Sequence, residues 1–130
     1  MKKFPPFVTS GANAVAGSHD PSVAGFVFDG ADDVQIIFWQ CEKGGESADH
    51  VHDFWEWAVV LEGTFDGLVG GNPLHLGPGE ECLIPPGVRH SGRYSAGYRA
   101  IDAFSGHRID RAVLGAASSR RPARRKPGAR

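Results

Sequence analysis

Short apolar runs alternate with turn residues along most of the chain, and helical periodicity is scarce. We predict strands over residues 23–28, 34–41, 54–61, 65–69, 81–84 and 98–104. Turn signals between these runs include Asp29-Gly30, Gly44-Gly45, Gly70-Gly71 and Pro85-Pro86. Many short strands, tight turns and the lack of crossover helices predict an all-β fold, an antiparallel sandwich or barrel.

The length of 130 residues suits one compact domain, and 41% of the residues are hydrophobic. Residues 1–22 are rich in Gly, Ala and Pro, so we expect an irregular N-terminal arm lying over a barrel at residues 23–107. Residues 108–117 are a possible short helix. The basic tail at residues 118–130 lacks apolar anchors and is expected to be disordered.

The formal net charge of −1 is unevenly distributed, because the tail holds six of the fourteen Lys and Arg. The remaining residues are acidic, and no basic face runs through them, so no specific nucleic-acid partner is expected. No apolar stretch reaches the roughly 18 residues of a membrane-spanning helix. The N-terminus lacks the apolar region of a signal peptide, and we expect a cytoplasmic protein.

Cys41 and Cys82 both lie inside apolar runs. Two cysteines are too few for a disulfide scaffold, and we expect reduced thiols that pack as small hydrophobic side chains. A thiol ligand or nucleophile is the alternative.

The apolar runs at 56–61 and 36–39 have little polar alternation, which indicates strands covered on both faces. A second subunit would provide this cover, so a homodimer is expected; the N-terminal arm is the alternative cover.

One polar segment carries the candidate chemistry. His50 and His52 are two residues apart and would point to one face of a strand, while Glu56 lies early in the next strand. A neighbouring antiparallel strand could bring the Glu56 carboxylate to the same ion. His90 begins a strand after the Pro85-Pro86 turn. Three imidazoles and one carboxylate would leave one or two positions of an octahedral metal open, which suits catalysis.

These residues fit two motifs of the cupin superfamily, and the chain resembles a small single-domain bacterial cupin. The first motif, G-x5-H-x-H-x3-E-x6-G, is matched by Gly44, His50, His52, Glu56 and Gly63. The second, G-x5-P-x-G-x2-H-x3-N, is matched by Gly79, Pro85, Gly87 and His90, with Tyr94 at the position of Asn. Residues 64–78 separate the motifs.

The resemblance implies a double-stranded β-helix, or jelly roll, with a metal at its centre. The implied ligands are His50, His52, Glu56 and His90. The implied cofactor is one divalent ion, and Fe, Mn, Ni, Zn, Co and Cu all stay open. Strand alternation from His90 predicts that Tyr94 faces inward, which makes it the best candidate for acid–base catalysis. Further candidates are Tyr98, His75, Asp102 and His107.

Cupins perform dioxygenation, decarboxylation, isomerisation, lyase and cyclisation chemistry, and the motifs do not select one of these. We expect a metalloenzyme that acts on a small carbonyl, enol or carboxylate compound. Aromatic residues around the motifs favour a partly apolar substrate over a phosphorylated sugar. The alternative is a metal-containing module that binds or senses a small molecule without turnover.

Overall fold

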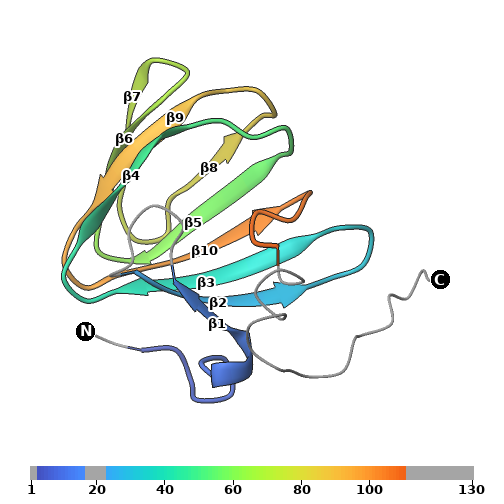
Figure 1. The fold of residues 1–130 in the computed structure, drawn as a ribbon. Coiled ribbons are helices and arrows are strands. Elements are labelled where there is room, and N and C mark those ends of the chain that lie inside the picture. Colours follow the sequence, from blue (N-terminus) through green and yellow to red (C-terminus); the bar gives the residue numbers. More distant parts are fainter. Residues whose placement is uncertain (1–2, 17–22, 111–130) are drawn as a thin grey trace.

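A computed structural model describes residues 3–16 and 23–110, which form two antiparallel sheets that face each other (Figure 1). The six-stranded sheet has the order β1 (Ala14–Ala16), β2 (Ala24–Asp29), β3 (Gln35–Cys41), β10 (Tyr98–Phe104), β5 (Glu56–Glu62), β8 (Glu81–Ile84). The four-stranded sheet has the order β4 (Gly45–His50), β9 (His90–Tyr94), β6 (Phe65–Val69), β7 (Asn72–Leu76). The predicted all-β jelly-roll fold is confirmed.

Three predicted strands, 65–69, 81–84 and 98–104, agree with β6, β8 and β10 residue for residue. The apolar runs at 23–28, 34–41 and 54–61 correspond to β2, β3 and β5 with ends shifted by one or two residues. β7 was not predicted, because Pro73 lies in it and its residues resemble a turn and a loop. Proline is tolerated there because β7 is at the edge of its sheet.

The core lies between the sheets and follows the alternation of the strands. Along β3 every second residue is buried, beginning with Gln35 and ending with Cys41. Val27, Ile37 and Val60 are completely buried in this core. The inner face of the six-stranded sheet therefore forms one wall of the barrel interior.

The N-terminal segment covers part of the outer face of the six-stranded sheet, on the side away from the smaller sheet (Figure 1). Phe4 and Val8 are buried against Phe26, and the Phe4 and Phe38 rings meet edge to face with centroids 5.2 Å apart. A three-residue 3₁₀ turn, η1 (Gly11–Asn13), connects this segment to β1. The N-terminal arm thus covers part of this apolar face, which was the alternative to cover by a second subunit. The homodimer stays a prediction.

After β10, residues 105–110 form bends, so the first residues of the predicted helix at 108–117 are not helical, and residues 111–117 lie outside the described residues. The predicted tail at 118–130 is outside them as well. A buried side chain holds this segment: Gln35 Nε2 donates to Ile109 O at 3.0 Å, and Ile109 N donates to Gln35 Oε1 at 3.0 Å. Within the described residues, no helix has the length and hydrophobicity to cross a membrane.

Candidate metal centre

The four predicted ligands come from both sheets. His50 ends β4 and pairs in register with His90, the first residue of β9. His52 lies in the connection after β4, and Glu56 is the first residue of β5. The sequence had suggested that Glu56 comes from a strand beside His50. Instead, β5 belongs to the opposite sheet, so Glu56 reaches the site across the barrel interior.

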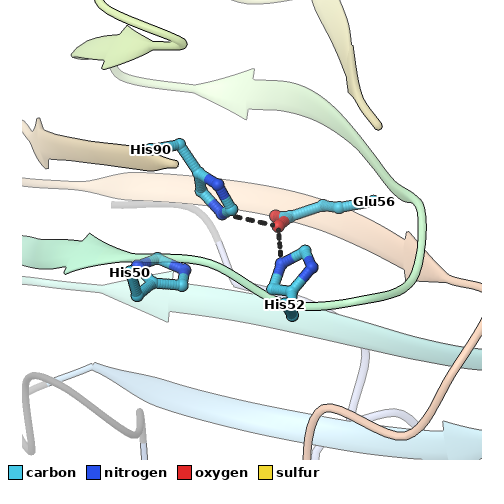
Figure 2. Close-up of side chains that lie close together, drawn as sticks. All are labelled: His50, His52, Glu56 and His90. Carbon is cyan, nitrogen blue, oxygen red and sulfur yellow. Dashed lines mark hydrogen bonds and ion pairs between the residues drawn. The ribbon is translucent and has the colours of Figure 1, made fainter. Parts of the chain in front are cut away.

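These four side chains converge on one point (Figure 2). One ligand atom from each residue lies within 4.8 Å of the corresponding atoms of the other three. The Glu56 Oε1 atom is 3.0 Å from His52 Nε2 and 3.3 Å from His90 Nε2. Glu56 and His90 are buried, whereas His50 and His52 are half-buried, so the cluster lies inside the barrel with one side toward its opening.

Each histidine is oriented by a backbone carbonyl two residues away in the chain. These carbonyls belong to Ala48, Phe54 and Val88, which lie 2.7, 3.1 and 2.9 Å from the Nδ1 atoms of His50, His52 and His90. An Nδ1–H that donates to a carbonyl leaves Nε2 as the basic nitrogen, and Nε2 is the atom that faces the cluster.

The donor set fits a divalent cation. With Nδ1 protonated, His52 Nε2 and Glu56 Oε1 are both electron-pair donors, and a proton or a cation between them makes the short contact favourable. Within the described part of the chain, His90 Nε2 is buried without a hydrogen-bond partner. A buried nitrogen of this kind is costly unless something binds it, and a metal ion would do so.

The electrostatics of Glu56 favour its charged form. Burial would raise the pKa of this carboxyl, but the imidazoles of His52 and His90 beside it and the positive charge of Arg108 outweigh burial and hold the pKa well below its usual value. A carboxylate that stays ionised inside the barrel is suited to binding a cation.

A second carboxyl, Asp102 on β10, lies beside Glu56. Burial and the negative charge of Glu56 raise the pKa of Asp102 well above its usual value. The protonated Asp102 can donate a hydrogen bond to the Glu56 carboxylate, and the Trp39 indole donates to Asp102. Asp102 and Trp39 thereby support the orientation of Glu56 from outside the cluster.

A pocket opens on the cluster and contains His50, Glu56 and His90 in its wall. Its other lining residues are mostly apolar or aromatic and include Val23, Trp39, Phe65, Leu76, Ile84, Tyr94 and Tyr98. The rings of Tyr94 and Tyr98 stack with centroids 5.1 Å apart, and Phe65 stacks on Tyr94 at 6.5 Å. The pocket thus offers an aromatic wall next to the polar cluster.

The structure separates the acid–base candidates into two groups. Tyr94, Tyr98 and Asp102 line the pocket, and burial raises the pKa of the Tyr98 phenol far above its usual value. His75 is exposed and pairs with Asp66 at 2.5 Å, away from the pocket. His107 is also exposed, 3.9 Å from Asp29, and it does not line the pocket.

Ser91 also contributes to the pocket wall, although strand alternation predicts an outward side chain. The two cysteines are free thiols, and Cys41 is completely buried. Cys82 lines the pocket, and burial raises the pKa of its thiol to about 11, so it is protonated at neutral pH.

Sequence reasoning missed Arg108, which lines the pocket and places its Nη1 atom 3.3 Å from His50 Nε2. Its guanidinium also lies over the Phe104 ring, 5.7 Å from the centroid. Arg108 follows the last strand and falls outside both motifs, so nothing in the local pattern of residues distinguishes it from the other arginines near the C-terminus.

Residues 37–96 match the family model described as Cupin domain. The two facing antiparallel sheets and the His-His-Glu-His cluster at their centre agree with this match. Residues 37–96 therefore form a cupin domain. Among curated proteins, none matches the chain at a significant level.

Several solved structures have the same fold. An RmlC-like cupin from Shewanella frigidimarina is 24% identical, with a TM-score of 0.66 over 82% of this chain and 96% of that one. KdgF from Halomonas sp. is 21% identical, with a TM-score of 0.62 over 68% and 84% of the two chains. A variant of Bacillus subtilis oxalate decarboxylase is 15% identical, with a TM-score of 0.64 over 82% of this chain and 30% of its own. Another structure of that decarboxylase concerns its Mn(II) centres.

Proposed function

We propose that this protein is a metal-dependent cupin enzyme that acts on a small carbonyl, enol or carboxylate compound. The observation that carries the proposal is the convergence of His50, His52, Glu56 and His90, with one ligand atom from each within 4.8 Å of the rest. Four protein ligands leave room for substrate on a six-coordinate ion, and the pocket opens on the same atoms.

The residues fix the site before any ion or substrate arrives. Backbone carbonyls hold the three Nδ1–H groups, so the Nε2 lone pairs are directed at the cluster at little further entropic cost. Asp102 holds Glu56 through a hydrogen bond, and Trp39 in turn holds Asp102. The metal, when bound, supplies Lewis acidity toward a substrate oxygen, and Fe, Mn, Ni, Zn, Co and Cu are all compatible with this donor set.

The pocket wall favours a partly apolar substrate. Trp39, Phe65, Tyr94 and Tyr98 exclude water from one side of the pocket and offer flat apolar surface. Tyr94 has its side chain in the pocket, and we propose it as the residue that exchanges a proton with the substrate. That a similar fold in oxalate decarboxylase carries Mn(II) centres supports a metal in this one.

The experiment measures metal content by elemental analysis of protein purified without a metal-binding tag. Wild type is expected to carry close to one divalent ion per chain, and His52→Ala and Glu56→Ala are expected to lose it. His75→Ala is the matched control, because His75 is exposed outside the pocket and its loss leaves the cluster intact. Circular dichroism checks that all variants stay folded. Stoichiometric metal in both ligand variants would overturn the ligand assignment.

The same preparations separate an enzyme from a binding module. The loaded protein is incubated with a panel of carbonyl, enol and carboxylate compounds while oxygen uptake and products are followed. Oxygen consumption would select a dioxygenase, and product without oxygen uptake would select an isomerase, lyase or cyclase. Stable binding with no turnover on the panel would favour the non-catalytic module over the enzyme.

A further inference from the structure

We propose that Arg108 binds a carboxylate group of the substrate beside the metal centre, which narrows the substrate class to carboxylates with an apolar body. This inference rests on the proposed function, because it places the carboxylate next to the ion that the four ligands would hold. The observations that support a role for Arg108 are separate from those that support the four metal ligands, and they come from the segment after β10.

Arg108 lies directly beside the cluster. The guanidinium of Arg108 is half-buried, lines the same pocket as Glu56 and His90, and comes within 3.3 Å of His50 Nε2. A substrate group that approaches the cluster through this pocket therefore meets Arg108. The planar fork of an arginine can donate two parallel N–H bonds to a carboxylate, which fixes the orientation of the bound group.

The charges around the pocket favour an anion. Of the described residues that line the pocket, Arg108 is the only Arg or Lys, and the acidic groups are Glu56 and Asp102. The positive charges of a divalent ion and of Arg108 together exceed the single negative charge of Glu56. They also exceed the two negative charges that are present when Asp102 is ionised as well. The loaded pocket is therefore positive and complements an anion.

A buried side chain holds the backbone next to Arg108 in place. Gln35 on β3 is completely buried and exchanges two hydrogen bonds with the backbone of Ile109, the residue after Arg108. Its Nε2 atom also donates to Asp29 Oδ1 at 3.0 Å, which fixes the amide itself. Ile109 is buried in the core as well. This anchor holds the backbone at Arg108, so the guanidinium is in place before an anion binds.

The rest of the pocket indicates what the carboxylate is attached to. Phe65, Tyr94 and Tyr98 stack in sequence, with interplanar angles of 23° and 19°, and they form a flat wall of the pocket. A flat wall of rings suits a planar apolar group. The site therefore fits a molecule with a carboxylate at the cluster and an unsaturated or aromatic body on the rings.

The test compares benzoate with benzamide, which has the same shape and no charge, by calorimetric titration of the metal-loaded protein. Wild type is expected to bind benzoate more tightly than benzamide. Arg108→Gln should weaken benzoate binding by about tenfold to a hundredfold, the effect of losing a hydrogen bond to a charged group, and should leave benzamide unaffected. The benzoate affinity of Arg108→Lys should lie between those of wild type and Arg108→Gln, because lysine keeps the positive charge and lacks the planar pair of N–H donors.

Metal titration of the same variants keeps the two proposals distinguishable. Removing a positive charge beside the cluster should leave the affinity for the divalent ion unchanged or raise it, so Arg108→Gln shifts cation and anion binding differently. The control is Arg93→Gln, an exposed arginine that does not line the pocket. Wild type without metal binding would overturn the proposed function together with this inference.

With metal bound normally, three results would overturn the role of Arg108 alone. These are benzoate binding that Arg108→Gln does not weaken, equal affinity of wild type for benzoate and benzamide, and no measurable benzoate binding to wild type. Gln35→Met tests the anchor: it should weaken benzoate binding without lowering metal content, whereas a merely structural role would reduce both together.

Discussion

At the residue scale, the candidate metal centre depends on which nitrogen of each histidine faces inward. The spacing of His50, His52 and His90 predicted the donor set, but not this choice. The choice is made by three carbonyls that accept from Nδ1, and each of them lies two residues from its histidine. The path of the backbone at these positions, which the sequence pattern does not reveal, thus decides the coordinating atom.

Arg108 could not be predicted for a different reason. Its place in the pocket depends on the hydrogen bonds between Gln35 and Ile109, which are 74 residues apart in the chain. The sequence shows a glutamine, Gln35, in an apolar run, but it does not show that this side chain is buried or that it bonds to the backbone of Ile109. The contact is a property of the folded chain and has no local signature.

A surface histidine gives a residue-scale prediction for pH dependence. The hydrogen bond and the negative charge of Asp66 raise the pKa of His75 above 6.5. The pair therefore stabilises the fold fully below the unfolded pKa, and this contribution is lost as the pH rises through the folded pKa. Titration followed by NMR should show the raised pKa in wild type and a lower one in Asp66→Asn. The same pKa for His75 in both proteins would contradict the assigned contact.

At the scale of elements, the sequence predicted strands best where the residues are apolar. β10 and β8 were correctly bounded, whereas β4, with the sequence Gly-Glu-Ser-Ala-Asp-His, shows no apolar alternation. Membership of a sheet was also not readable, since β4 and β5 are consecutive in the chain and lie in opposite sheets. Glu56 therefore faces the histidines across the interior, an arrangement set by the pairing of distant strands.

Close contact between β9 and β6 gives a prediction at this scale. A Cβ atom at Gly92 would lie 2.0 Å from Phe65 Cζ, so the Phe65 ring must move away from its place beside Tyr94. Gly92→Ala should lower the free energy of unfolding by about 1–3 kcal/mol, the usual cost of overpacking. Gly11→Ala is the control, because nothing lies within 4 Å of its Cβ position. Urea unfolding measures both, and equal midpoints would contradict the contact.

At the scale of the whole molecule, the N-terminal segment is part of the folded domain. It buries Phe4 and Val8 against the outer face of the six-stranded sheet, while Trp57 and Leu83 stay exposed elsewhere on that face. The sequence indicated strands covered on both faces, but it could not say whether the cover comes from the same chain. The predicted homodimer can be checked by measuring the mass in solution.

Two phenylalanines of the same segment form a matched pair for testing the arm. Phe4 is 7% exposed and packs on Phe38, whereas Phe7 is 79% exposed. Phe4→Ala should lower the free energy of unfolding by about 3 kcal/mol, and Phe7→Ala should change it by less than about 0.5 kcal/mol. Chemical unfolding monitored by fluorescence measures both. Similar small effects from the two substitutions would mean that the arm does not pack on the sheet in solution.

One measurement tests the metal centre most directly: anomalous diffraction from crystals of the metal-loaded protein, collected at the absorption edge of the bound element. We predict a single strong peak about 2.0–2.2 Å from the Nε2 atoms of His50, His52 and His90 and from a Glu56 carboxylate oxygen. A loaded crystal with no peak at this position, or with a peak bound by Nδ1 atoms or other residues, would contradict it.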